Sequence, residues 1–203
     1  MRKIITLFQR NYETDRLVRP EIVAGAEWAL LGEGQATVKI DGTSCLVKDD
    51  KLYRRYELRK GKTPPPDFIA AQEPDPVTGE APGWVRVGDG PEDRWHREAW
   101  EYAQTHGPGL RDWTYELIGP KVQGNPYNLT AHELRPHGGQ LVDLPLHRME
   151  AERTFELIRR FLMEHPMEGI VWWRDANLID PDCEKVKIKA RDFRIAWPVK
   201  AEK

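Results

Sequence analysis

The sequence has little of what defines several large classes of protein. Only two of its 203 residues are cysteines, Cys45 and Cys183, and they form no Cys-x-x-Cys pair, which argues against a disulfide scaffold or a zinc–thiolate site. No apolar run approaches the roughly 20 residues of a membrane span. The N-terminal segment also lacks the features of a secretory signal. We therefore expect a cytoplasmic protein with no membrane partner.

An excess of positive charge is also missing. Lys and Arg total 31 and Asp and Glu total 33, which gives a net charge of −2. Proteins that bind nucleic acid through bulk charge are strongly basic, so a site for a polyanion has to be a local patch. The six histidines show no His-Glu-x-x-His or other metal-ligand spacing, which argues against a metalloprotease.

The order of the expected elements predicts an α+β protein with mostly antiparallel sheets. The length favours one domain over residues 1–203, and residues 60–91, which carry seven of the 16 prolines, are expected to be a partly ordered insertion. Strands are predicted within 36–58, 113–118, 140–144, 168–174 and 185–189. Helices are predicted from Pro91 to Gly107 and over 148–164.

Segment 37–42 carries the first motif that suggests chemistry, Lys-Ile-Asp-Gly at its end. Because alternate side chains of a strand point to opposite faces, Thr37, Lys39 and Asp41 are expected to share one face, opposite two apolar residues. A lysine beside a carboxylate on such a strand is a candidate nucleophile. The alternative is an ordinary surface strand that ends in an Asp-Gly turn.

Three more lysines alternate along a later strand. Lys185, Lys187 and Lys189 are interleaved with two apolar residues, which predicts a row of ammonium groups opposite an apolar face. Such a row can bind phosphate groups. A solvated edge strand that uses lysine to prevent aggregation has the same pattern, so the row by itself leaves both interpretations open.

Carboxylates and arginines complete the set of candidate residues. Glu116 lies among apolar neighbours, and a buried acid requires a partner such as a sugar hydroxyl, a metal ion or a cation. Glu168 precedes a strand that begins with glycine, a residue that permits close approach of a ligand. Arg54 and Arg55 are expected on opposite faces of their strand, so only one of them can reach a shared site.

Taken in order along the chain, these motifs resemble those of the covalent nucleotidyltransferase superfamily, which contains ATP-dependent ligases and mRNA capping enzymes. The matching motifs are Lys39-Ile-Asp-Gly, an arginine of strand 52–58, Glu116-Leu-Ile-Gly, Glu168-Gly-Ile-Val and Lys187-Ile-Lys189. Further segments are similar to those of the vertebrate 5′-to-3′ RNA ligase and its small microbial relatives. These are Gly83-Trp-Val, Trp95-His96, Gly124-Asn-Pro-Tyr, Pro136-His-Gly and Trp197-Pro198.

The resemblance implies an adenylation domain with flanking helices and the activity of an ATP-dependent RNA ligase. Lys39 is then expected to attack the α-phosphate of ATP and to carry AMP. The AMP passes to an RNA 5′-phosphate, and a 3′-hydroxyl displaces it to seal the strand. Mg²⁺ or Mn²⁺ is the expected metal ion, and RNA with these two kinds of end is the expected partner.

The resemblance also implies a role for each candidate residue. Lys187 and Lys189 are expected to bind the α-phosphate, Glu116 and Arg55 the ribose hydroxyls, and the backbone around Thr37 and Val38 the adenine edge. Arg54 and Arg59 remain alternatives to Arg55. The expected nucleotide-binding residues are therefore Thr37, Val38, Lys39, Arg55, Glu116, Glu168, Lys187 and Lys189, and the expected metal ligands are Asp41 and Glu168.

The sequence departs from the superfamily pattern after Lys189. We therefore expect no C-terminal OB-fold domain with its final motif, which argues against DNA sealing and mRNA capping. A capping-type guanylyltransferase or a DNA ligase nevertheless shares the lysine–nucleotide intermediate and stays an alternative. A non-catalytic nucleotide- or RNA-binding domain of the same fold is a third interpretation.

Overall fold

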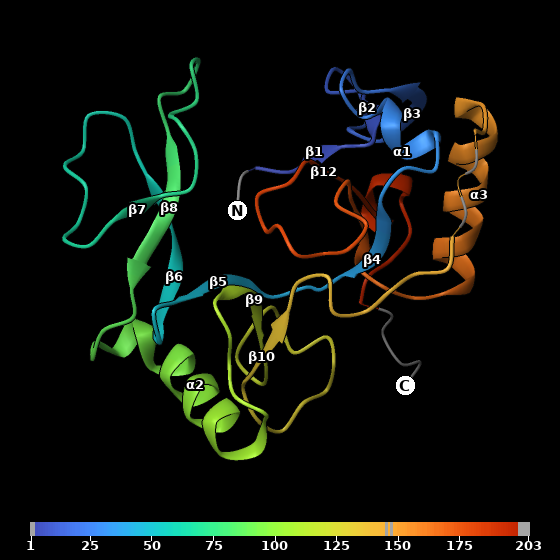
Figure 1. The fold of residues 1–203 in the computed structure, drawn as a ribbon. Helices are drawn as coiled ribbons and strands as arrows, with labels where there is room; N and C mark the ends of the chain where they lie inside the picture. The colour runs from blue at the N-terminus through green and yellow to red at the C-terminus, as the bar shows by residue number, and fades with distance from the viewer. Residues whose placement is uncertain (1–2, 145, 147, 199–203) are drawn as a thin grey trace. The chain divides into compact units, whose positions relative to one another are not determined.

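The computed structural model describes residues 3–144, 146 and 148–198 (Figure 1). The chain divides into two compact units. Unit 1 consists of residues 1–3 and 41–137, and unit 2 consists of residues 4–40 and 138–203. The chain therefore passes from unit 2 to unit 1 after Ile40 and returns after His137. That the two units constitute one domain over 1–203 stays a prediction.

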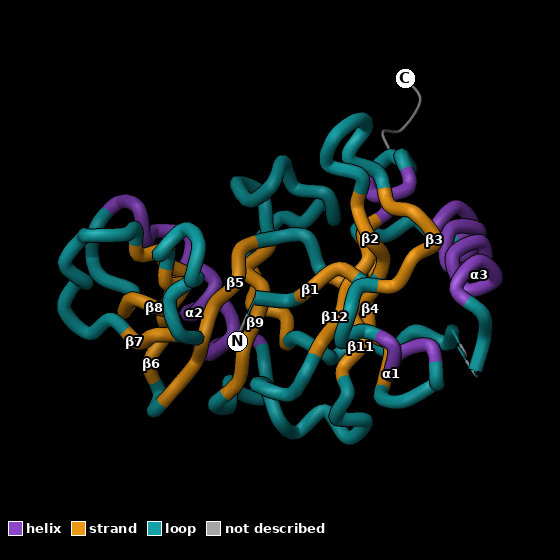
Figure 2. The backbone as a smooth tube through the Cα atoms, turned by 90° about the horizontal axis from the view of Figure 1, so that it is seen from above, coloured by secondary structure: helices purple, strands orange, loops and turns teal. Residues whose placement is uncertain are grey.

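Strands and loops make up most of the described chain, and helices are few, as Figure 2 shows. The strand pairings in the described residues are antiparallel apart from the short pairing of β1 (Ile5–Thr6) with β12 (Lys185–Lys189). The chain is thus of the mixed α+β class with mostly antiparallel sheets, as expected. Over the same residues, no helix combines the length and the apolar character needed to cross a bilayer.

A four-stranded sheet forms the centre of unit 2. Its strand order is β1, β12, β11 (Gly169–Trp173) and β4 (Gln35–Lys39). The other elements of the unit are β2 (Phe8–Arg10), β3 (Val18–Ile22), α1 (Glu27–Leu30), α3 (Ala151–Glu164) and the 3₁₀ helix η2 (Ala190–Phe193).

The two faces of the sheet in unit 2 differ because polar and apolar residues alternate along β4 and β12. One face contributes Ile170, Val186 and Ile188 to the hydrophobic core, where they are at most 1% exposed. Helix α3 contributes Ile158 and Leu162 to the same core, and its apolar stripe at helical spacing explains why it packs there. The opposite face of β12 carries its three lysines.

A six-stranded antiparallel sheet forms the centre of unit 1. Its strand order is β10 (Glu133–Pro136), β9 (Trp113–Ile118), β5 (Thr43–Lys48), β6 (Lys51–Leu58), β8 (Ala81–Arg86) and β7 (Ile69–Ala70). The 3₁₀ helix η1 (Pro91–Asp93) leads into α2 (Arg94–His106), which contacts β10 and β6. Residues 60–91, predicted to be a proline-rich insertion, provide β7 and β8.

The structure confirms most predicted elements and differs from the prediction in several places. The expected strand over 140–144 is wrong, since this segment makes only an isolated bridge, between Leu141 and Thr37. Leu141 is 61% exposed, so the apolar residue that suggested a strand lies outside the core. Strand β10 was not predicted, because its sequence, Glu-Leu-Arg-Pro, has few β-formers. Helix α3 begins at Ala151 instead of 148.

Candidate functional site

Lys39 forms an ion pair with Glu168 in unit 2. Lys39 is the last residue of β4 and lies opposite Gly169 of β11. Its Nζ is 2.6 Å from Oε2 of Glu168, and the side chains of the two residues are 19% and 9% exposed. A carboxylate that has lost most of its water requires such a charged donor. The nucleophile predicted from the sequence therefore points at one of the two predicted metal ligands.

Lys189 binds the other oxygen of the same carboxylate. It lies opposite Gly169 from β12, the neighbouring strand on the other side, and its Nζ is 2.6 Å from Oε1 of Glu168. The carboxylate therefore accepts one charge-assisted hydrogen bond on each oxygen.

Glycine at 169 allows this arrangement. A Cβ atom at this position would lie 2.1 Å from the carbonyl oxygen of Ile188 and 2.9 Å from Cα of Lys189. Both are backbone atoms of the paired strand, so they cannot give way without separating β11 from β12. The glycine of the Glu-Gly motif thus permits close pairing at the point where the two lysines reach Glu168.

Lys187 lies one row further along the same face, opposite Val171. Burial, together with the positive charges of Lys189 and Lys39, lowers the pKa of Lys187 to about 8, while Glu168 and Asp192 act in the opposite direction. Three lysines thus gather around the single carboxylate of Glu168. This part of the sheet has an excess of positive charge and is suited to an anionic ligand.

Thr37 and Val38 already have hydrogen-bond partners within the protein. The hydroxyl of Thr37 donates to the carbonyl of Val171 at 3.1 Å and accepts a hydrogen bond from Nε1 of Trp173 at 3.0 Å. The backbone N–H of Val38 donates to the carbonyl of Gln140 at 2.9 Å, and its side chain lies against the core. That the backbone here contacts adenine stays a prediction.

In unit 1, the strand register places Glu116 and Arg55 on one face of the six-stranded sheet. Ser44 is paired with Glu116, and its neighbour Cys45 is paired with Arg54. Because directly paired residues share a face, Arg54 lies on the face of Cys45, whereas Arg55 lies on the face of Ser44 and Glu116. The expectation that the two arginines point in opposite directions is confirmed.

The three candidate arginines differ in their partners. Arg54 is paired with the buried Asp93, with 2.8 Å between Nε and Oδ1. Nε of Arg55 donates to Glu57 at 3.1 Å, and its guanidinium lies 5.2 Å from the ring centre of Trp84. Arg59 follows β6 and is exposed.

Glu116 is buried and contacts His137, a residue to which the sequence analysis gave no role. Nε2 of His137 lies 2.7 Å from Oε2 of Glu116, and Glu116 is 8% exposed. The segment Pro136-His-Gly carried part of the family resemblance. Because β10 was not predicted, the strand register that brings His137 next to β9 could not be predicted either.

Asp41 lies beyond the strand that was expected to contain it. Strand β4 ends at Lys39, so the alternation of faces does not extend to Asp41, whose backbone N–H donates to the hydroxyl of Tyr127 at 2.7 Å. A Cβ atom on the following residue, Gly42, would lie 2.2 Å from the carbonyl oxygen of Leu117. The glycine of the Lys-x-Asp-Gly motif thus lets the chain run directly against β9.

The metal ligands expected at Asp41 and Glu168 fall in unit 1 and unit 2, respectively. Within the part of the chain that the structure describes, no group of three or more His, Cys, Asp and Glu residues is placed to hold one ion. A hard cation at Glu168 would therefore take most of its ligands from phosphate and water, which is the usual pattern for Mg²⁺.

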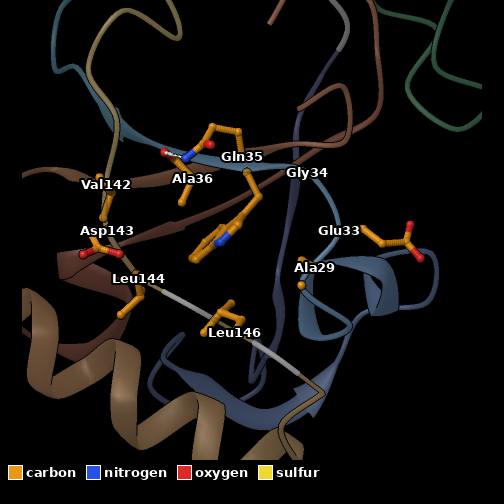
Figure 3. A pocket seen from close by; sticks show the side chains of 11 residues that line it. Ala29, Glu33, Gly34, Gln35, Ala36, Val142, Asp143, Leu144 and Leu146 are labelled. Carbon is orange, nitrogen blue, oxygen red and sulfur yellow. Dashed lines mark hydrogen bonds between the residues drawn. The ribbon is translucent and has the colours of Figure 1, made fainter. Parts of the chain in front are cut away.

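A pocket of about 140 Å³ lies elsewhere in unit 2 and is lined by none of the predicted site residues. Its lining includes Trp172, whose side chain lies on the core face of the sheet. Leu144 and Leu146 point into the pocket, and the carboxylate of Glu33 points away from them (Figure 3). The pocket is thus distinct from the cluster of Lys39, Glu168 and Lys189.

Comparison with known proteins gives relatives of a single kind. No family model matches the chain. RNA ligase 1 of Danio rerio is 26% identical, and RNA ligase 1 of Mus musculus is 27% identical; each comparison covers 81% of this chain and 68% of the relative. RNA ligase 1 of Rattus norvegicus is 26% identical over the same shares. The chain is a distant relative of RNA ligase 1. This relationship agrees with the resemblance inferred from the motifs.

Proposed function

We propose that this protein is an ATP-dependent RNA ligase of the covalent nucleotidyltransferase superfamily, with Lys39 as the residue that carries AMP. The observation that carries the proposal is the cluster of Lys39, Glu168, Lys187 and Lys189 on one face of the sheet in unit 2. The distant relationship to RNA ligase 1 supports RNA as the substrate. The fold of mostly antiparallel sheets supports the superfamily.

The first step of the proposed reaction forms a bond between Nζ of Lys39 and the α-phosphorus of ATP and breaks the bond to pyrophosphate. Nζ must lose a proton in this step, and Glu168, at 2.6 Å, is placed to accept it. The AMP then moves to the 5′-phosphate of an RNA, which regenerates the lysine. Finally, an RNA 3′-hydroxyl attacks that phosphate, and AMP leaves.

Lys187 and Lys189 are the proposed α-phosphate ligands. Phosphoryl transfer depends mainly on positioning and on stabilisation of charge on the phosphate oxygens. Both lysines extend from β12 on the face of the sheet that also carries Lys39. Lys39 extends from β4, on the other side of β11. Lys189 already binds a carboxylate oxygen, which is a chemical analogue of a phosphate oxygen.

Glu116 and Arg55 are the proposed ligands of the ribose hydroxyls. Their position on one face of the sheet in unit 1 supports this assignment and favours Arg55 over Arg54, which is paired with Asp93 on the other face. A carboxylate accepts hydrogen bonds from hydroxyl groups, and a guanidinium donates to their oxygens.

Mg²⁺ or Mn²⁺ is the proposed metal ion, with Asp41 and Glu168 as its protein ligands. Their carboxylate oxygens fit a hard cation, although each oxygen of Glu168 accepts a hydrogen bond from a lysine and must exchange that partner to bind metal. When bound, the ion neutralises phosphate charge. The protein's own lysines supply positive charge at the same place.

The decisive experiment measures AMP on the protein. Purified protein incubated with ATP and Mg²⁺ should gain one AMP, and peptide mass spectrometry should locate it at Lys39. Lys39→Ala and Lys39→Arg should both lose the adduct, whereas Lys48→Ala, a change at an exposed lysine of β5, should retain it. An adduct that persists in Lys39→Ala contradicts the mechanism. Absence of any adduct in the wild type favours the non-catalytic alternative, and labelling by GTP instead of ATP favours a guanylyltransferase.

The strand lysines have their own test. Lys187→Ala and Lys189→Ala should each slow adenylylation of Lys39 by about 10²-fold or more, in line with loss of one transition-state donor. Lys185 is a matched control because it lies on the same face of β12 but donates to the carbonyls of Pro181 and Cys183. Lys185→Arg should react at close to the wild-type rate. Wild-type rates in both alanine variants would mean that the row is only a solvated strand surface.

A further inference from the structure

His137 presents its imidazole to a single oxygen of Glu116. Oε2 of Glu116 lies 2.7 Å from Nε2 of His137, and Oε1 takes no part in this contact. A carboxylate that is 8% exposed is stable only when it is well supplied with donors. Glu116 therefore has one oxygen that is held and a second that can accept a further hydrogen bond.

Two hydrogen bonds fix the backbone of His137 against β9. The N–H of His137 donates to the carbonyl of Thr114 at 3.0 Å, and its carbonyl accepts a hydrogen bond from Nε1 of Trp113 at 2.8 Å. These contacts continue the pairing of β10 with β9 by one residue beyond Pro136. Since Pro136 is paired with Tyr115, the next residue faces the same way as Glu116.

The hydrogen bonding of the imidazole indicates which nitrogen carries the proton. Nδ1 of His137 is buried and has no hydrogen-bond partner in the described structure. An imidazole with its proton on Nε2 leaves only a lone pair at Nδ1, whereas a second N–H there would be a buried donor without an acceptor, which costs more. His137 is thus the donor, and Oε2 of Glu116 is the acceptor.

We propose that His137 is a positioning residue that holds the Glu116 carboxylate so that Oε1 accepts a hydrogen bond from a ribose hydroxyl of ATP. The assignment rests on the proposed function. It adds a consequence for specificity, because a buried acceptor prepared for a hydroxyl is left without its donor when a deoxynucleotide binds. The Glu116–His137 pair therefore selects ribonucleotides over deoxyribonucleotides.

A second histidine–carboxylate pair in the same unit provides a matched comparison. Nδ1 of His132 lies 2.9 Å from Oε2 of Glu98, and His132 is 6% exposed. The side chain of Glu98 is 40% exposed, and its other oxygen accepts a hydrogen bond from Arg94. Each oxygen of Glu98 therefore already accepts a hydrogen bond, and this carboxylate is largely in contact with water.

The test measures adenylylation with ATP, 2′-dATP and 3′-dATP in the wild type and in His137→Ala, His137→Gln and His132→Gln. Wild-type kcat/KM should be about 10- to 100-fold higher for ATP than for at least one deoxy analogue, in line with a hydrogen bond to a charged group. In His137→Ala this ratio should fall at least several-fold, mainly through a higher KM for ATP. His137→Gln, whose amide donates near the position of Nε2, should keep most of the ratio.

The outcomes separate this assignment from the proposed function. A wild type that forms no adenylate contradicts the proposed function and the role of His137 with it. An active wild type whose His137→Ala variant loses the same factor on all three nucleotides contradicts only the positioning role, because a structural defect does not discriminate between sugars. His132→Gln should keep the wild-type ratio, and a loss there equal to that in His137→Ala would also overturn the assignment.

Discussion

Lys39 and Lys189 bind opposite oxygens of one carboxylate, that of Glu168, from strands on either side of β11. Glu168 thus neutralises part of the charge that the lysines bring together and sets their orientation before any ligand binds. A phosphate group can replace this partner because it offers the same kind of oxygen to the same donors. The resting arrangement is therefore prepared for an anion.

Glu168→Gln should cost stability as well as activity. An amide oxygen is a weaker acceptor and its NH₂ repels an ammonium donor, so two lysines lose their compensating charge. We expect unfolding free energy to fall by about 2–3 kcal/mol and adenylylation to fall by at least 10²-fold.

Urea unfolding and AMP transfer measure the two effects of Glu168→Gln separately. Glu184→Gln is the control, because Glu184 also binds a cation, Arg174, but its side chain is 64% exposed, and a surface pair contributes about 0–1 kcal/mol. Added sulfate should restore part of the stability of Glu168→Gln alone. A variant as stable as the wild type would show that the two lysines do not depend on this carboxylate.

Gly169→Ala should disrupt the site through the backbone. The added Cβ would lie 2.1 Å from the carbonyl oxygen of Ile188, so β11 and β12 have to separate where Lys189 reaches Glu168. We expect a loss of about 2–4 kcal/mol in unfolding free energy, in the range of severe steric substitutions. Gly88→Ala is the control, since its nearest atom would be 3.7 Å away. Similar unfolding midpoints for the two variants would refute the steric argument.

Lys187 should make stability depend on pH in a defined direction. Its pKa is about 8 in the folded protein and 10.5 in a free lysine, so the unfolded chain binds this proton more tightly and folding is penalised whenever the group is charged. The penalty is complete below pH 8 and disappears as the pH rises towards 10.5. Lys187→Met removes it, so the variant should be more stable than the wild type at pH 7 by on the order of 2 kcal/mol after allowance for solvent screening.

The check on Lys187 compares urea unfolding of Lys187→Met and wild type at pH 7 and pH 10. The difference between the two proteins should shrink as the pH rises, because Lys187 of the wild type then loses the charge that the fold penalises. Lys48→Met, at an exposed lysine, should give no such pH-dependent difference. An advantage of Lys187→Met that is the same at both pH values would show that the charge of Lys187 is not penalised in the fold.

The positions of the site's lysines on their strand could be predicted from the sequence, because strand periodicity is a local signal. Alternation along 185–189 correctly placed Lys187 and Lys189 on one face, and Val186 and Ile188 in the core. It did not show that Gly169 lies between Lys39 and Lys189, since strand order and register depend on contacts between distant segments.

The carboxylate partners were harder to predict for the same reason. The bond between His137 and Glu116 requires β10, whose four residues carry a weak strand signal, and the pairing of Arg54 with Asp93 requires the packing of α2. The alternation argument that placed Asp41 beside Lys39 did not apply, because β4 ends at Lys39. The length of a strand is set partly by its neighbours, which a single sequence does not reveal.

The last prediction is that the protein seals RNA ends in preference to DNA ends. The relatives are RNA ligases, and a net charge of −2 leaves little positive surface for holding a long duplex. Recognition then depends on groups close to the joint, where 2′-hydroxyls distinguish RNA from DNA. We expect modest, salt-sensitive binding and a discrimination that appears mainly in the sealing step.

The measurement uses strands with a 5′-phosphate and a 3′-hydroxyl that differ only in the two nucleotides flanking the joint. All-RNA substrates and DNA strands with ribonucleotides at the joint should both be sealed. Equal sealing of all-DNA strands would overturn the RNA assignment, whereas accumulation of adenylylated RNA without sealing would show that the final step requires a further component.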